Sequence, residues 1–153
     1  MKQLLTIILA LVLLVTNSCD SDVASDQSVG NVQLPLLEDY LDVFLKEAEK
    51  RGVVIDKDKL DSLELIYREQ PPNVLGVCRV TASNRLEVSI DPSRPVSVKW
   101  TTIHELGHCL LRMLHRDDVL SIMNSVEVSI KLDEADPDEL FDEFFQDKFF
   151  DAY

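Results

Sequence analysis

The segment His104-Glu105-Leu106-Gly107-His108 dictates much of how this chain can fold. Residues four apart in a helix lie one turn apart on nearly the same face, so its two imidazoles can reach a single metal ion. The surrounding run, Trp100–Leu114, is largely apolar, which indicates that the helix is buried. We therefore predict a buried helix, from about residue 96 to residue 111 or 112, that carries a metal site.

The residue types in this segment suit the chemistry of zinc-activated water. Neutral imidazoles are good zinc ligands, and a carboxylate beside the metal can accept the proton of a water molecule. The pattern H-E-x-x-H therefore predicts that His104 and His108 bind Zn²⁺ and that Glu105 is the general base. The chain contains 3 histidines, and the third, His115, follows soon after the pair.

The third zinc ligand is less constrained by the sequence. A catalytic zinc ion usually has three protein ligands, and His115 is the first candidate. On a straight helix it would lie about 16 Å along the axis from His104, too far to share a metal ion. The chain must fold back after the helix. Because no glycine occurs there, either a residue such as Arg112 adopts a left-handed conformation or the extra residue is absorbed in a looser turn. The other candidates are carboxylates, namely Asp117, Asp118, Glu127 and Glu134.

These residues resemble the motif of the metzincin metallopeptidases, H-E-x-x-H-x-x-G-x-x-H followed by a methionine turn. The first five positions match residues 104–108, and Ser121-Ile122-Met123-Asn124 stands where the turn is expected. Two positions depart from the motif. Leu111 replaces its glycine, and the third histidine comes one residue late, at position 115.

The resemblance implies a zinc peptidase in which His104, His108 and His115 hold the metal above a turn that contains Met123. In that family, an edge strand ahead of the helix holds the substrate in extended form, and residues 74–90 are the candidate here. The family's tyrosine, two positions after the turn methionine, falls on Ser125.

The rest of the chain predicts one α+β domain over residues 34–153, with a small mixed β-sheet. Apolar residues at three- and four-residue steps indicate an N-terminal helix from about Leu34 to Arg51, with Gly52 at its C-cap. Asp136-Pro137 predicts the start of a C-terminal helix that continues to about Phe150. Between them we expect the helix of the histidine pair and the methionine turn.

Three β-rich runs, 63–67, 74–81 and 85–90, supply the strands. We expect a polar loop over residues 56–61 and a two-residue hairpin turn at Ser83-Asn84. In the third run, apolar and polar residues alternate, which predicts that one face of the sheet is exposed to solvent.

Residues 1–18 have the pattern of a secretory signal, in which Lys2 precedes the apolar run Leu4–Val15 and a short polar end. The junction resembles a bacterial lipobox, which implies that Cys19 is lipidated; the alternative is an ordinary signal peptide that is cleaved elsewhere. Residues 19–33 are polar and lack apolar periodicity, as in a flexible tether. We expect a lipid-anchored protein of the bacterial cell envelope, on the periplasmic or the outer surface of the outer membrane.

The chain is acidic, with a net charge of −13, and loss of Lys2 with the signal would leave −14. Such a field repels nucleic acid and anionic lipid head groups. We therefore expect no nucleic-acid partner and membrane contact through the lipid anchor only. We expect the protein to be a monomer. Its expected partner is a protein or peptide substrate.

Cys78 and Cys109 would remain in the exported chain. An oxidising compartment permits a disulfide between the strand region and the histidine helix, and two buried free thiols are the alternative.

Two functions are compatible with these features. The first is a zinc metalloendopeptidase with Glu105 as the base. The second is a lipid-anchored envelope protein that binds a partner and keeps zinc as a structural element. Glu105 favours the first, because a structural zinc site has no use for a base beside the metal.

Overall fold

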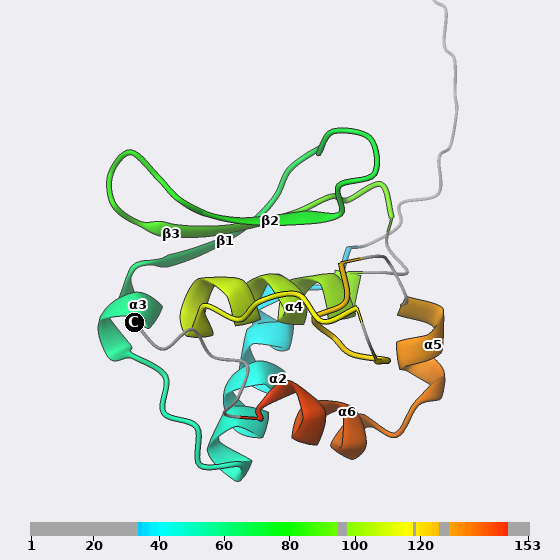
Figure 1. Cartoon of the computed structure of the whole chain (residues 1–153). Helices are drawn as coiled ribbons and strands as arrows, with labels where there is room; N and C mark the ends of the chain where they lie inside the picture. Colours follow the sequence, from blue (N-terminus) through cyan, green and yellow to red (C-terminus); the bar gives the residue numbers. More distant parts are fainter. Residues whose placement is uncertain (1–33, 95–97, 118, 126–128, 147–153) are drawn as a thin grey trace, which may run out of the picture. The chain divides into compact units, whose positions relative to one another are not determined.

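The computed structural model describes residues 34–94, 98–117, 119–125 and 129–146, all within the unit Gln33–Tyr153. The elements of this part are α2 (Leu37–Lys50), α3 (Lys57–Asp61), β1 (Leu63–Tyr67), β2 (Gly76–Val80), β3 (Leu86–Ile90), α4 (Val98–Leu111), α5 (Ser129–Glu134) and α6 (Pro137–Phe144) (Figure 1). The predicted mixed class, helices with a small mixed sheet, is confirmed. The expected signal, Cys19 and the tether lie outside the described residues.

The sheet has the strand order β1-β3-β2. β3 lies in the centre, parallel to β1 and antiparallel to β2, with Leu65 and Cys78 both opposite Val88. Because β1 pairs with the third strand and not with the second, β2 becomes an edge strand of the sheet.

The hairpin between β2 and β3 has a three-residue loop, so the predicted two-residue turn is wrong. The amide of Thr81 donates to the carbonyl of Arg85 at 2.8 Å, which leaves residues 82–84 in the loop. Asn84 has a φ of 59°. A three-residue hairpin loop usually needs a left-handed residue at its end, and asparagine tolerates that conformation.

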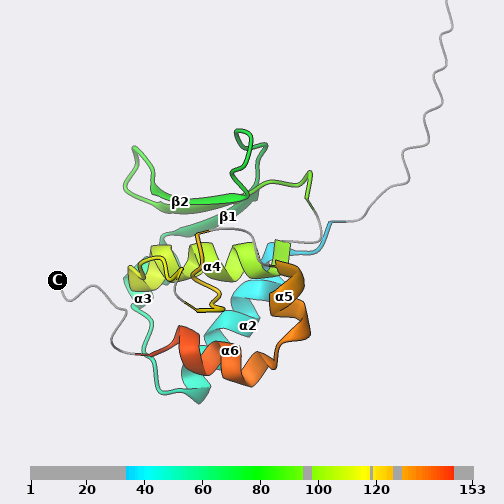
Figure 2. The same ribbon diagram turned by 45° about the vertical axis from the view of Figure 1, so that its right-hand side comes forward.

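Helix α4 lies between the sheet and helices α2 and α6. In both Figure 1 and Figure 2 the sheet covers one side of α4, while α2 and α6 lie on its other side. The side chains of Trp100, Ile103, Leu106 and Leu110 are buried around α4. None of the helices in the described residues is long and apolar enough to cross a membrane.

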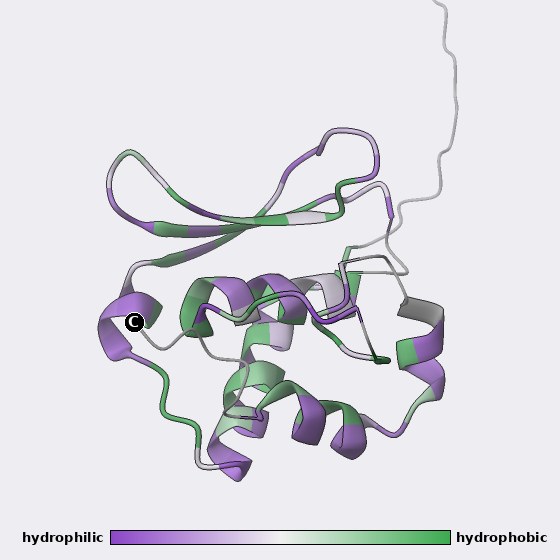
Figure 3. Ribbon diagram, viewed as in Figure 1, coloured by the Kyte–Doolittle hydropathy of each residue, from purple (hydrophilic) through white to green (hydrophobic). Residues whose placement is uncertain are grey.

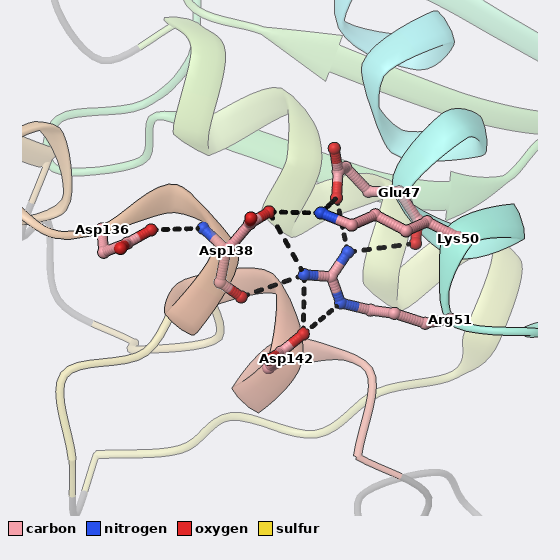
Figure 4. A network of polar contacts seen from close by, with 6 residues as sticks. All are labelled: Glu47, Lys50, Arg51, Asp136, Asp138 and Asp142. Atoms are coloured by element: carbon pink, nitrogen blue, oxygen red, sulfur yellow. Dashed lines mark hydrogen bonds and ion pairs between the residues drawn. The ribbon is translucent and has the colours of Figure 1, made fainter.

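Helices α2 and α6 share an aromatic core and a polar seam. The ring centroid of Phe44 lies 6.0 Å from that of Phe144 and 5.5 Å from that of Phe145. At the surface, Lys50 of α2 and its C-cap residue Arg51 contact Asp138 and Asp142 of α6 (Figure 4). Both helices carry hydrophobic and hydrophilic residues, as expected for helices with one buried face (Figure 3).

Helix α6 starts as predicted, because the side chain of Asp136 accepts a hydrogen bond from the amide of Asp138 and Pro137 occupies the first turn. It ends at Phe144, earlier than the predicted end near Phe150. Residues 147–153 lie outside the described part of the chain.

The predicted loop at residues 56–61 is instead the short helix α3. Asp56 caps it by accepting a hydrogen bond from the amide of Asp58 at 2.8 Å. The segment has only one apolar residue, Leu60, so it has no amphipathic periodicity from which a helix could be predicted.

The alternation of residues in β3 predicts that the outer face of the sheet is exposed to solvent. The structure shows that this prediction is wrong along β3. Glu87 and Ser89 are both buried. The guanidinium groups of Arg68 and Arg79 cover the carboxylate of Glu87, and Gln70 donates to the hydroxyl of Ser89 at 2.9 Å. A central strand is covered in this way because long side chains from both neighbours reach over it.

Candidate metal centre

Three imidazoles converge beside α4. The Nε2 atoms of His104 and His108 lie 3.0 Å apart, and that of His115 lies 3.1 Å from His108 Nε2. Within the described residues, these three side chains form the group that could hold a metal ion, with all ligand atoms within 4.8 Å of one another. Helix α4 supplies two of them, and the loop after it supplies the third.

The chain folds back after α4 at Arg112, which has a φ of 57°. Its amide donates to the carbonyl of His108 at 3.1 Å, and the amide of Met113 donates to the carbonyl of Gly107 at 3.2 Å. This is a left-handed helix end, formed without glycine. The direction of the chain reverses there, which is how His115 reaches the histidine pair.

Backbone carbonyls set the orientation of the two helical histidines. His104 Nδ1 lies 2.7 Å from the carbonyl oxygen of Ile122, and His108 Nδ1 lies 2.6 Å from that of Met113. A carbonyl only accepts, so each Nδ1 must donate its hydrogen, which leaves both Nε2 lone pairs free for a metal. Burial lowers the pKa of His104 to about 4 and also lowers the pKa of His108. Both rings are therefore neutral at pH 7, the form that binds metal.

Glu105 lies between α4 and the edge strand. Its side chain is buried, and its carboxylate accepts a hydrogen bond from the backbone of Cys78. Burial raises the pKa of Glu105 to about 7, against the opposing effect of that hydrogen bond. A Cβ atom on Gly76 would lie 2.8 Å from both Glu105 Cγ and Thr101 Cγ2, so only glycine permits this approach of β2 to α4.

A disulfide also joins β2 to α4. The structure bonds Cys78 to Cys109, with their Cα atoms 5.5 Å apart. One partner is the residue that hydrogen-bonds Glu105, and the other directly follows His108 in the chain. The cross-link therefore joins the two elements that position Glu105 and His108.

Met123 lies in a turn packed against α4. Its amide donates to the hydroxyl of Ser121 at 3.0 Å, and its side chain is buried. Its sulfur would be 3.0 Å from a Cβ atom on Gly107, and Phe144 of α6 would be 2.9 Å from the same atom. Gly107 thus lets the turn and α6 approach the helix directly beside His108.

The carboxylates considered as third ligands do not join the described metal group. Asp117 Oδ1 accepts hydrogen bonds from the amide of Ser125 at 2.7 Å and from its hydroxyl at 2.8 Å. Asp117 therefore closes the loop that carries His115. Glu134 lies in α5, whereas Asp118 and Glu127 lie outside the described residues.

The three histidines open onto a cleft of about 690 Å³. The edge strand and the residues before it, 73–78, line this cleft, as do Ile122, Asn124 and Ser125 of the turn. The prediction from sequence did not include Arg94, Trp100 and Leu132 among the residues lining the site. Trp100 and Leu132 look like ordinary core residues in the sequence, and no spacing rule connects α5 with the histidine pair.

The donor set fits a zinc ion. With Zn–N distances of about 2.0–2.1 Å, ligands in a tetrahedral site lie about 3.3 Å apart. This is close to the 3.0 and 3.1 Å that separate His108 Nε2 from the Nε2 atoms of His104 and His115. Imidazole nitrogen suits zinc and other transition metals, whereas magnesium and calcium prefer oxygen ligands.

No protein-family model, curated protein or solved structure matches this chain.

Proposed function

We propose that this protein is a zinc-dependent endopeptidase of metzincin-like design, in which Glu105 is the general base. The observation that supports it best is the position of Glu105, a buried carboxylate beside three convergent imidazoles on a cleft. Carboxylate bases in enzymes are commonly held in such partly desolvated surroundings.

His104, His108 and His115 would hold the metal through their Nε2 atoms. A zinc ion in such a site lowers the pKa of water and polarises a carbonyl group. Glu105, in its ionised form, would take the proton of the attacking water on a carboxylate oxygen. It would then pass that proton to the nitrogen of the leaving amine. The hydrogen bond from the backbone of Cys78 would help to orient the carboxylate for both transfers.

The cleft supports a peptide as the substrate. β2 is an edge strand and lines the cleft, so an extended peptide could pair with its free edge beside the histidines. Side chains of the substrate would then point alternately into the cleft and out of it.

The number of ligands distinguishes this proposal from a purely structural zinc site. Structural zinc ions usually have four protein ligands, whereas the described metal group has three members. The remaining position would be open to water or substrate.

Glu105→Gln tests the proposal because it keeps the shape of the side chain and removes the base. The variant should bind one zinc ion per chain, as measured by elemental analysis, and should fail to cleave casein. Glu69→Gln removes an exposed carboxylate elsewhere and is the matched control. A wild type that binds zinc but cleaves no member of a broad peptide library would instead support an envelope binding protein with a structural zinc site.

We propose the cell envelope as the location, with a lipid on Cys19 as the anchor. Replacing Cys19 by serine should release the protein from the membrane fraction and abolish labelling by a radioactive fatty acid. Labelling that persists in the variant would contradict the proposed anchor.

A further inference from the structure

His115 is held differently from the other two histidines. His104 and His108 are fixed by α4 and by hydrogen bonds from Nδ1 to carbonyl groups. His115 is exposed and lies in the loop that follows α4, where neither a helix nor a strand constrains it. Its position must therefore depend on how its neighbours in the loop are anchored.

Arg116, the next residue, is anchored twice. Its amide donates to the carbonyl of Met123 at 2.7 Å. Its guanidinium donates to Glu143 Oε1 of α6, also at 2.7 Å, and the two side chains are only 13% and 19% exposed. This ion pair joins the loop of His115 to a helix distant in sequence.

Helix α6 touches the centre at a second point. Phe144, adjacent to Glu143, packs against α4 at Gly107, between the two helical histidines in sequence. At its other surface, α6 is held to α2 by the ion pairs of Arg51 and Lys50 (Figure 4). It is therefore a fixed support in contact with both the helix and the loop that carry the metal ligands.

The chemistry of Glu143 indicates more than a stabilising role. Its Oε2 atom is buried and has no hydrogen-bond partner among the described residues. A partly buried ion pair with an unsatisfied oxygen is a poor source of stability, but such pairs can specify one arrangement of the chain.

We infer that Glu143 is a positioning residue that holds His115 in the metal site through Arg116. The inference depends on the three histidines binding a metal ion, as in the proposed function, but not on peptide cleavage. Loss of Glu143 should leave the helical pair intact and loosen the loop ligand, which shifts the site from three ligands toward two.

Zinc affinity in a double-mutant cycle tests this role. Apparent dissociation constants for Zn²⁺ would be measured by competition with a chromophoric chelator for wild type, Glu143→Gln, His115→Ala and the double variant. Glu143→Gln should weaken binding by about 10–100-fold, the usual effect of removing a supporting residue. In the His115→Ala background it should have no further effect, because the ligand on which it acts is absent.

Glu139→Gln is the matched control, because it removes an exposed carboxylate from the same helix and should bind zinc like the wild type. If Glu143→Gln does not fold, Glu143→Asp keeps the charge while shortening its reach, and it should still weaken binding. The visible spectrum of the Co²⁺-substituted protein should change in both Glu143 variants, because it reports the number of ligands.

Two results would overturn the inference. One is wild-type affinity in both Glu143 variants, and the other is an equal loss with and without His115, which would mean a general effect on the fold. A wild type that binds no zinc would refute the metal site itself, and with it the proposed function.

Discussion

At the residue scale, Arg112 shows how a local conformation makes a distant contact possible. Its left-handed backbone, with φ of 57°, turns the chain so that His115 reaches the histidines of α4. A non-glycine residue pays about 1–2 kcal/mol for this conformation. The same reversal completes the cluster of three histidines that could hold a metal ion.

Arg112→Gly should therefore raise the free energy of unfolding of the metal-free protein by about 0.5–1 kcal/mol, because relief of strain exceeds the extra backbone entropy of glycine. Urea denaturation measures this difference. Arg112→Ala, which keeps the Cβ atom, is the control and should give no such gain. Equal stability of the two variants would show that the conformation is not strained.

Single substitutions also test which residue is the third ligand. Removal of a supporting residue costs about 10–100-fold in metal affinity, so removal of the ligand His115 should cost more than about 100-fold. Asp117→Ala should cost far less, because the carboxylate binds Ser125. Chelator competition measures both constants, and the reverse order of effects would assign the ligand role to Asp117.

At the element scale, the decisive relation is that of β2 to α4. The glycine at position 76 allows close approach, the Cys78–Cys109 disulfide joins the two elements, and the Cys78 backbone binds Glu105. An edge strand held this closely places the base and the proposed substrate side by side.

Two measurements test the disulfide: the number of free thiols, and the effect of a reductant on the free energy of unfolding. Unfolded, unreduced Cys19→Ser protein should contain no free thiol. A reductant should lower the free energy of unfolding by roughly 3–4 kcal/mol, as expected for a closed loop of about 30 residues. The Cys78→Ser/Cys109→Ser variant should not respond to reductant. Two free thiols in the unreduced protein would contradict the cross-link.

Gly76→Ala tests the close approach itself. The added Cβ atom would lie 2.8 Å from Glu105 Cγ and from Thr101 Cγ2, so β2 must move away from α4. We expect a loss of about 1–3 kcal/mol in the free energy of unfolding, typical of overpacking, and slower casein cleavage with zinc still bound. Unchanged stability and cleavage would show that the contact is easily relieved.

At the scale of the whole molecule, metal binding should couple parts of the chain far apart in sequence. The centre draws on α4, the loop after it and, through Arg116, on α6. A ligand that binds only the folded state stabilises the whole domain by mass action.

Zinc at a free concentration one hundred times its dissociation constant should add about 2.7 kcal/mol to the free energy of unfolding. For a domain of this size, this corresponds to a rise of roughly 8–15 °C in the melting temperature, measured by calorimetry. His104→Ala/His108→Ala protein should show no rise. An equal rise in wild type and variant would place the zinc ion elsewhere.

The sequence by itself determined the features that depend on near neighbours. Helix geometry explains the four-residue spacing of His104 and His108, the capping sequence at Asp136-Pro137 and the need for the chain to fold back after the histidine pair. The structure decided that this reversal occurs through a left-handed residue, Arg112. The β-rich runs likewise follow from local alternation. The periodicity of apolar residues is a local property, so it identifies helices and strands and indicates which face of each is apolar.

Only the tertiary structure decided which partners those elements take. Pairing of β1 with β3 made β2 the edge strand, and side chains from neighbouring segments buried Glu87 and Ser89. Loop folding likewise committed Asp117 to Ser125, and a contact between more distant segments brought Glu143 to the loop of His115. Such pairings depend on competition among many residues distant in sequence. The hydrophobic periodicity of a single segment therefore does not show which partner that segment will take.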